Sequence, residues 1–312
     1  MKKIMSFILV VGVALFLTAC GANEGSSSEA DSNDKVKVVT TIAQIGEPLS
    51  VIGGDRIEVE SLMGPSVDPH LYNPTQSDVA TVDGADVILY SGLHLEANMI
   101  EMFNKISESK PVLAVGSVIP EESLLADAEG VVDPHIWFDI DLWKQALDAA
   151  VEELKDYSPD DADYFEENKQ AYFAKLDELK EEAEVLQDIP EEQRVLVTAH
   201  DAFGYFGQMH NMEVIGLQGL STEDEIGVSD INDTIETIQE YSVPAIFVES
   251  SINPDSIEAV IEGAQDQGVD VSLGGELYSD AMGDPDSEEG TYIGMYRHNL
   301  ETIYQSLTEG DE

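Results

Sequence analysis

The chain has 312 residues, 43% of them apolar, so it is long enough for one large or two medium-sized domains with hydrophobic cores. With 14 basic and 64 acidic residues, its formal net charge at pH 7 is -50. A surface of that charge repels nucleic acids and anionic membranes, so we expect neither as a partner. The acidic residues are spread along the whole chain, and we interpret them as a solvated surface adapted to a salty or alkaline medium. A role in substrate binding is the alternative.

The first residues have the pattern of an export signal. Two lysines precede the apolar run IMSFILVVGVALF, which is too short for a stable membrane span, so we assign residues 1–19 to a signal peptide. The following LTAC resembles the bacterial lipobox, in which the cysteine is lipidated and becomes the mature N-terminus; an ordinary secretory signal is the alternative. This residue, Cys20, is the only cysteine, which excludes a disulfide within the chain and a thiolate metal site. We expect residues 20–34, rich in Gly, Ser and acidic residues, to be a flexible tether outside the cell membrane.

After the tether, short runs rich in β-branched residues alternate with amphipathic stretches, a pattern typical of βα units and parallel sheets. The first half contains the runs VKVVTT, RIEVESLMG, ADVILYSGL and KPVLAVGS. The second half contains RVLVTAH, MEVIGLQGL, PAIFVESSI and VDVSLGGEL in corresponding order and spacing. We therefore predict an α/β fold of two similar lobes with parallel sheets, at residues 35–157 and 190–312.

The segment between the lobes has the features of one long helix. Ser158 is a candidate N-cap, Pro159 suits the first helical position, and Asp161 follows as in a capping box. One apolar stripe then continues at helical spacing through Phe165, Tyr172, Leu176, Leu179, Ala183 and Leu186. We expect a rigid linking helix at residues 158–189 that limits hinge bending between the lobes. A coiled-coil partner for this stripe is the alternative.

Three of the six histidines fall at or after the ends of predicted strands. His70 and His135 each stand in an Asp-Pro-His tripeptide, where proline stiffens the loop, and His200 ends the strand VLVTAH. Asp280 stands after the last strand of the second half. The carboxyl ends of parallel strands face the crevice where ligands bind, so we expect these four side chains to meet in a cleft between the lobes. Three imidazoles and a carboxylate suit zinc, and a carboxylate that can bind through two oxygens also accommodates manganese.

Other residues near these positions have two interpretations each. Asp68 and Asp133, two residues before His70 and His135, could accept the second ring N–H of those histidines or cap their own loops. Carboxylates with a weaker case for the same role are Asp139 and Glu249. Aromatic residues that could keep the site dry, or pack in the core, are Trp137, Phe138 and Phe203. We expect the other histidines to lie on helices and not to bind metal: His94, His210 and His298.

The segments DPHLYNPTQSD, DPHIWFDI, VTAHDAFGYF, VESSI and GGELYSDAMG together resemble the zinc/manganese-binding receptors of bacterial ABC importers. The resemblance covers nearly all of the chain after the tether. It implies two α/β lobes joined by one rigid helix, with the metal held between them by His70, His135, His200 and Asp280. It also implies that the ion is delivered to a membrane permease driven by a cytoplasmic ATPase.

Two departures from the patterns of this family concern the metal. Dedicated zinc receptors often carry a long His- and acid-rich loop before the second ligand, and the corresponding GSVIPEESLLADAEGVVDPH is short and lacks such a tract. Manganese-selective receptors commonly have glutamate where this chain has His200. The histidine makes the site of this chain softer than theirs. The choice between Zn²⁺ and Mn²⁺ stays open, and we expect a receptor that binds either.

The sequence thus predicts a monomeric, lipid-anchored, extracytoplasmic receptor for Zn²⁺ or Mn²⁺ that is not an enzyme. Binding needs deprotonated imidazoles, so we expect the affinity to fall as pH drops through the histidine range. One alternative is a receptor of the same architecture for a metal chelate, such as a siderophore or corrinoid. A less favoured one is an extracytoplasmic zinc hydrolase, which would need an open coordination position and a nearby base. A surface adhesin has no supporting sequence feature.

Overall fold

The computed structural model describes residues 35–223 and 225–308. The predicted signal peptide, lipidation site Cys20 and tether lie outside the described residues. Within the described part, no helix combines the length and the apolar character that crossing a membrane requires.

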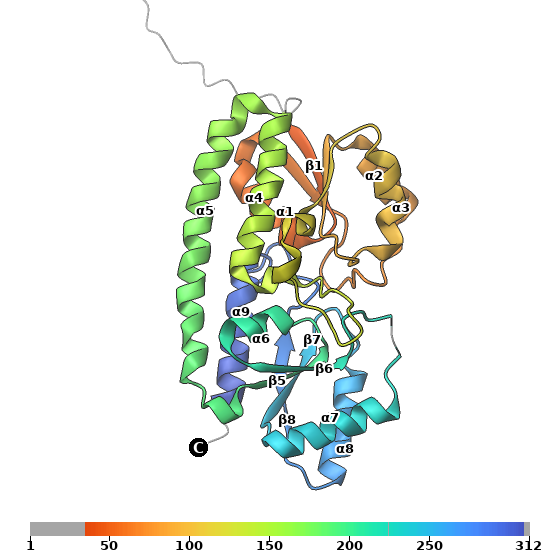
Figure 1. Ribbon diagram of the computed structural model, residues 1–312, viewed down its shortest axis with the longest axis vertical. Coiled ribbons are helices and arrows are strands. Elements are labelled where there is room, and N and C mark those ends of the chain that lie inside the picture. Colours follow the sequence, from red (N-terminus) through yellow and green to blue (C-terminus); the bar gives the residue numbers. More distant parts are fainter. Residues whose placement is uncertain (1–34, 224, 309–312) are drawn as a thin grey trace, which may run out of the picture. The chain divides into compact units, whose positions relative to one another are not determined.

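The first lobe is built on a parallel four-stranded sheet in the order β2-β1-β3-β4 (Figure 1). Its strands are β1 (Val36–Thr40), β2 (Ile57–Ser61), β3 (Val87–Tyr90) and β4 (Val112–Ala114). The central strands are apolar and buried, as expected where helices cover both faces of a parallel sheet. The helices of this lobe are α1 (Ala43–Gly53), α2 (Gln76–Gly84), α3 (Ile100–Ile106) and α4 (Ile140–Tyr157).

The second lobe has the same strand succession, but its strands form two parallel two-stranded sheets, β5-β6 and β7-β8, that lie side by side. Its strands are β5 (Val195–His200), β6 (Glu213–Gln218), β7 (Ala245–Glu249) and β8 (Ser272–Leu277). Strand β5 pairs in parallel with β6, and β7 with β8, while β5 lies beside β7. The resulting order β6-β5-β7-β8 corresponds to β2-β1-β3-β4 of the first lobe, which confirms two similar α/β lobes. The helices here are α6 (Gly204–His210), α7 (Val228–Tyr241), α8 (Asp255–Asp266) and α9 (Tyr292–Thr308).

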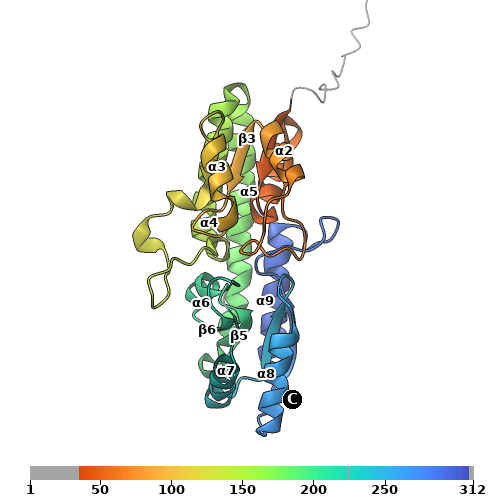
Figure 2. The ribbon, with the colours of Figure 1, turned by 90° about the vertical axis from the view of Figure 1, so that its right-hand side faces the viewer.

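A single long helix, α5 (Ala162–Glu182), runs alongside both lobes (Figures 1 and 2). It begins a turn later than predicted, because Pro159–Asp161 forms a 3-10 helix before it, with Ser158 Oγ 2.8 Å from Asp161 Oδ2. A second 3-10 segment, Ala183–Asp188, follows it. The predicted apolar stripe of this segment is buried throughout.

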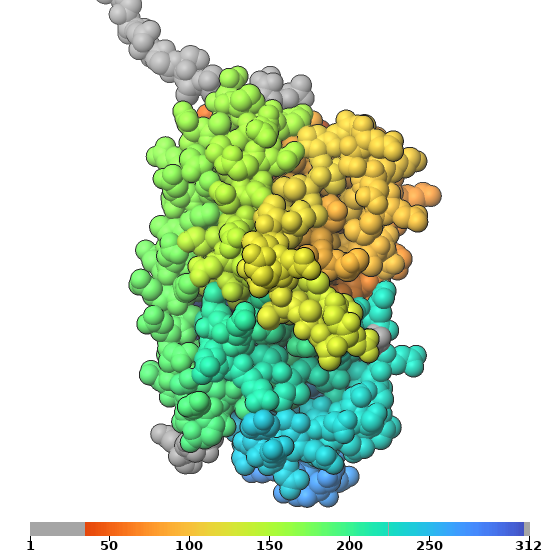
Figure 3. All heavy atoms as spheres, viewed as in Figure 1, coloured from red at the N-terminus to blue at the C-terminus, as the bar shows by residue number. Residues whose placement is uncertain are grey.

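The larger hydrophobic core is continuous across both lobes. It includes Val38 of β1, Leu176 of α5, Phe206 of α6 and Ile303 of α9. A smaller core, with Val197 of β5, fills the second lobe away from the first. The first lobe also reaches over the second through the loop between β4 and α4, drawn in yellow where it crosses the junction (Figure 3). There the backbone N–H of Leu125 donates to the hydroxyl of Tyr205 in α6, so the lobes are packed and hydrogen-bonded together.

Candidate metal centre

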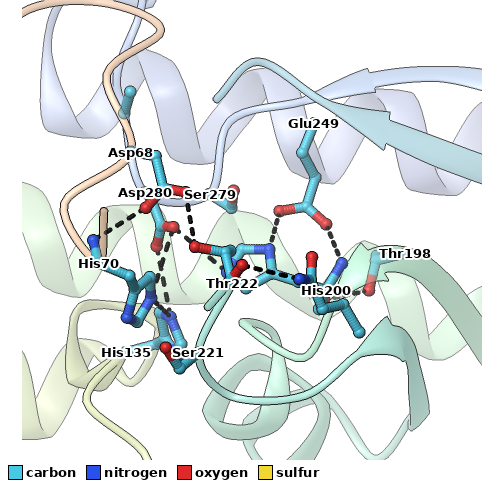
Figure 4. A network of polar contacts seen from close by, with 12 residues as sticks. Asp68, His70, His135, Thr198, His200, Ser221, Thr222, Glu249, Ser279 and Asp280 are labelled. Carbon is cyan, nitrogen blue, oxygen red and sulfur yellow. Dashed lines mark hydrogen bonds and ion pairs between the residues drawn. The ribbon is translucent and has the colours of Figure 1, made fainter. Parts of the chain in front are cut away.

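The structure brings the four predicted ligands together from four separate loops or strand ends (Figure 4). His70 lies in a turn after β2, and His135 directly precedes the 3-10 helix Ile136–Phe138. His200 is the last residue of β5, and Asp280 follows β8 by three residues. One candidate ligand atom from each residue lies within 4.8 Å of the others, and no side chain of the four is more than 4% exposed. Each lobe therefore contributes two buried side chains to one cluster.

Both carboxylate oxygens of Asp280 face imidazole nitrogens. Oδ1 lies 3.3 Å from His135 Nε2, while Oδ2 lies 3.3 Å from His200 Nε2 and 3.7 Å from His70 Nε2. The Nε2 atoms of His70 and His135 are 3.4 Å apart. Three nitrogens and two oxygens thus converge on one point, a donor set that fits a divalent transition metal.

Two further carboxylates hold the imidazoles in place. Asp133 Oδ1 accepts the backbone N–H of His135 at 2.9 Å and lies 2.7 Å from its Nδ1. Glu249, at the end of β7, accepts the backbone N–H of His200 through Oε1 at 2.8 Å, with Oε2 2.6 Å from Nδ1. A carboxylate at Nδ1 fixes the ring orientation and leaves Nε2 directed at the centre of the cluster.

The two interpretations of Asp68 and Asp133 have different outcomes. Asp133 both caps its loop and contacts the ring of His135. Asp68 caps only the backbone, accepting the N–H groups of His70 at 2.8 Å and Leu71 at 3.4 Å. Its other oxygen accepts the hydroxyl of Thr222, 2.6 Å away in the second lobe.

Asp139, which was a weaker candidate for contact with a histidine, has another role. Its Oδ1 accepts the backbone N–H groups of Asp141 and Leu142 at 2.9 and 3.0 Å, so it caps α4. This side chain fixes the start of the helix that follows the His135 loop.

The cluster strongly perturbs its own pKa values. Burial lowers the pKa of His70 to about 4. Burial also acts to lower the pKa of His135, but the charges of Asp133 and Asp280 outweigh it and raise the value to about 9. The pKa of His200 is likewise raised, because Glu249 and Asp280 outweigh its burial. Burial opposes ionisation of Asp280, yet the surrounding imidazoles hold its pKa well below the usual range.

The three aromatic candidates are all fully buried. The ring of Trp137 lies edge-on to His135 at 5.3 Å, so it borders the cluster. Phe138 and Phe203 stack on each other at 4.5 Å and belong to the core behind it. Trp137 thus borders the cluster, whereas Phe138 and Phe203 pack in the core.

The remaining histidines lie outside the cluster. The prediction of a helix at His94 is wrong: this exposed residue lies in a turn with φ of 70°. His210 ends α6, where its Nε2 lies 2.9 Å from the hydroxyl of Tyr296. His298 lies on α9, with its Nε2 2.9 Å from the carbonyl oxygen of Glu276.

Sequence reasoning missed Gln44 of α1 and Thr222. Gln44 is fully buried and donates to the backbone carbonyls of Ser279 and Asp280 at 3.2 and 3.0 Å. Its only signal in the sequence is a polar residue on the buried face of AQIGEPLSVIG. Thr222 lies 154 residues from its partner Asp68, and no local pattern connects the two.

The glycine pair Gly274-Gly275, before the Asp280 loop, has tight backbone geometry. Gly275 has φ of 139°, and the pairing of β7 with β8 shifts register between Ile246 and Phe247. A Cβ on Gly274 would lie 2.6 Å from the ring of Phe247. Both positions therefore require glycine, which sets the path of β8 toward Asp280.

Two α/β lobes that share a buried His/Asp cluster define the class of two-lobed metal-binding proteins. Residues 38–306 match the family model described as "Zinc-uptake complex component A periplasmic", and the chain belongs to this family. It is 44% identical to the manganese-binding lipoprotein MntA of Bacillus subtilis, over 98% of this chain and 99% of the relative.

A second curated relative is the zinc-binding protein TroA of Treponema pallidum, 42% identical over 98% of each chain. The solved structure of the periplasmic zinc-binding protein TroA from that organism superimposes with a TM-score of 0.86 at 45% identity. This superposition covers 88% of the present chain and 99% of that one. The relatives therefore share the complete two-lobed fold, and their names divide between manganese and zinc.

Proposed function

We propose that this protein is the extracytoplasmic receptor of an ABC importer and captures Zn²⁺ or Mn²⁺ with His70, His135, His200 and Asp280. The observation that carries the proposal is the approach of four candidate ligand atoms to within 4.8 Å of one another in a buried position. Buried ionisable groups at this density are costly unless they are paired or bind a metal.

The size and enclosure of the cluster favour a bare ion over the alternatives. A siderophore or corrinoid chelate needs a roomy cleft, whereas the imidazole nitrogens here lie 3.3 to 3.7 Å from the Asp280 oxygens. A catalytic zinc needs an open coordination position for water, whereas these side chains are at most 4% exposed. Binding without catalysis is therefore the better account of the site.

The donor set supports either metal. Three imidazoles suit Zn²⁺, and the two inward-facing oxygens of Asp280 allow the higher coordination number that Mn²⁺ accepts. The names of the two relatives, one manganese-binding and one zinc-binding, agree with a site of this intermediate kind. We propose that the protein binds both ions and transfers them to a permease powered by a cytoplasmic ATPase.

The proposed organisation follows from the sequence and from the lipoprotein relative. After removal of residues 1–19, a lipid on Cys20 would anchor the protein, and residues 20–34 would tether it. The lobes are residues 35–157 and 190–312, with residues 158–189 linking them. We propose that the receptor acts as a monomer, since each chain supplies all four ligands itself.

The assignment of ligands is tested by replacing them one at a time. Alanine at His135 or His200 should weaken the binding of Mn²⁺ and Zn²⁺ at least tenfold. Each replacement removes one proposed ligand and leaves the carboxylate paired with it, Asp133 or Glu249, buried without its imidazole partner. His94→Ala is the matched control, since that imidazole is exposed and outside the cluster. Affinities measured by competition with a chromophoric chelator would contradict the assignment if His94→Ala lost binding and His135→Ala kept it.

A further inference from the structure

We infer that Gln44 is a positioning residue for the metal centre: it holds the backbone of the Asp280 loop from the opposite lobe and thereby sets the preference between Mn²⁺ and Zn²⁺. This inference rests on the proposed function of the cluster. Gln44 lies on α1 of the first lobe, and its side chain is fully buried.

Two donors of the first lobe converge on the backbone of the second. The Nε2 of Gln44 donates to the carbonyl oxygens of Ser279 at 3.2 Å and Asp280 at 3.0 Å. The indole N–H of Trp137 donates to the same Ser279 carbonyl at 3.1 Å. Since Trp137 also packs edge-on against His135, this side chain connects the surroundings of one candidate ligand directly to the loop that carries the Asp280 carboxylate.

Described side chains of the second lobe hydrogen-bond to the backbone of this loop on either side of those two carbonyls. Asn299 of α9 pairs with both backbone groups of Tyr278, at 2.9 and 2.7 Å. The hydroxyl of Ser250 donates to the carbonyl of Ala281 at 3.3 Å. Among the described residues, the carbonyls of Ser279 and Asp280 receive side-chain hydrogen bonds from the first lobe alone.

The carboxylate of Asp280 depends on this backbone anchor for its orientation. Neither of its oxygens accepts a hydrogen bond from a backbone or amide donor in the described part of the chain; their close neighbours are the three imidazoles. The side chain is short, so the position of its own backbone decides whether both oxygens face the centre. Gln44 provides that position with a neutral donor that adds no charge beside the metal.

The cost of Gln44 in the core also indicates a role beyond packing. Its Oε1 is buried and has no hydrogen-bond partner among the described residues. An unsatisfied buried amide oxygen destabilises a protein, and an apolar side chain of the same length would avoid that cost. Within the part of the chain that the structure describes, the two bonds from its Nε2 to the Asp280 loop are the hydrogen bonds that this side chain makes in return.

The two metals should respond differently when the anchor is lost. Zn²⁺ is satisfied by four ligands, so three imidazoles and one oxygen of Asp280 suffice for it. Mn²⁺ is a harder ion that favours oxygen donors and a higher coordination number, so it needs the second oxygen of Asp280. A loop that is free to shift would keep one oxygen in place more easily than two.

The test is Gln44→Met in the full chain, which keeps the side-chain length and removes the amide donor with both of its hydrogen bonds to the Asp280 loop. We expect the affinity for Mn²⁺ to fall about ten- to a hundredfold and that for Zn²⁺ to fall several times less, as for other residues that orient a ligand. The electron paramagnetic resonance spectrum of bound Mn²⁺ should change with its coordination. Trp137→Phe, which removes the donor to Ser279 alone, should shift the ratio of affinities in the same direction by a smaller factor.

Asn168→Leu is the matched control. Asn168 donates from its side-chain amide to the backbone carbonyl of Ile52 in α1 at 2.9 Å. This bond also joins helix α1 to another element through an amide donor, but it does not contact the Asp280 loop. This variant should lower the unfolding temperature and leave the ratio of affinities and the Mn²⁺ spectrum unchanged.

The outcomes separate the two proposals. If the unaltered protein binds neither ion, the proposed function fails. If it binds both, and Gln44→Met leaves the ratio of affinities as it was, the inference about Gln44 is overturned while the function stands. Should Gln44→Met not fold, Trp137→Phe decides the question by the same ratio.

Discussion

At the scale of single residues, the clustering of the four candidate ligands and the carboxylate beside His135 could be predicted, whereas the support from Gln44 could not. His200 ends a strand, and the carboxyl ends of parallel strands converge at one edge, so sequence position alone indicates where its side chain lies. Asp133 could be named because it stands two residues from His135. Gln44 and Asp280 are 236 residues apart, and only the packing of the two lobes brings them together.

His210 gives a prediction about stability that is independent of the metal. It is 4% exposed, and burial, together with the charge of Lys180, lowers its pKa to about 4. The folded state therefore favours the neutral ring, and this contribution to stability is complete above pH 6.5 and is lost as pH falls toward 4. The difference in pKa corresponds to about 3 kcal/mol.

Denaturant unfolding of the protein and of His210→Gln at several pH values checks this. Glutamine can keep a hydrogen bond to Tyr296 but does not titrate. We expect the free energy of unfolding to fall more steeply between pH 6.5 and 4 in the unaltered protein than in the variant. Parallel curves would show that His210 already titrates normally in the folded state.

At the scale of elements, the strands and the linking helix could be predicted from hydrophobic pattern, and local turns could not. The helix expected around His94 is replaced by a turn because the buried carboxylate of Glu96 accepts the backbone N–H groups of Ser91 and Gly92. Positive φ values at Gly92 and His94 follow from that turn. The pattern GLHLEANM does not reveal that this glutamate points inward.

The contact between α4 and α5 contains a buried lysine. Lys169 is 7% exposed and pairs with Asp148 of α4 at 2.5 Å and Glu166 of α5 at 2.8 Å. Lys169→Met would leave those acidic groups facing each other, so we expect the free energy of unfolding to fall by about 1–2 kcal/mol.

Lys144→Met is the matched comparison, because Lys144 and Asp177 pair at 2.5 Å between the same helices in a more exposed position. The Lys144→Met replacement should lower the free energy of unfolding by about 0–1 kcal/mol. Equal losses for the two variants, measured by urea unfolding, would contradict a special role for the buried lysine.

At the scale of the whole molecule, charge is distributed unevenly. No lysine or arginine occurs between Val195 and Tyr296, where 21 residues are acidic. Lys144 and Lys155 of α4, Lys169 and Lys180 of α5, and Arg297 of α9 are engaged in ion pairs with neighbouring acids. The second lobe therefore has no cations of its own over this stretch to offset the repulsion between its acidic groups.

Salt should consequently stabilise the metal-free protein. Screening shortens the range of repulsion to about 3 Å at 1 M salt, which relieves the folded state of a net charge of -50. We expect the unfolding temperature to rise steadily as NaCl is increased, in scans made with a chelator present. A fall would mean that the ion pairs of the helices outweigh the repulsion in the rest of the molecule.

The central claim is that the two lobes hold a divalent transition metal at His70, His135, His200 and Asp280. Competition titration of the metal-free protein with Mn²⁺ and Zn²⁺ tests it most directly. We predict that one equivalent of either ion binds, that the two compete for one site, and that His200→Ala weakens both. Binding of neither ion, or simultaneous binding of both with His200→Ala unaffected, would contradict the account.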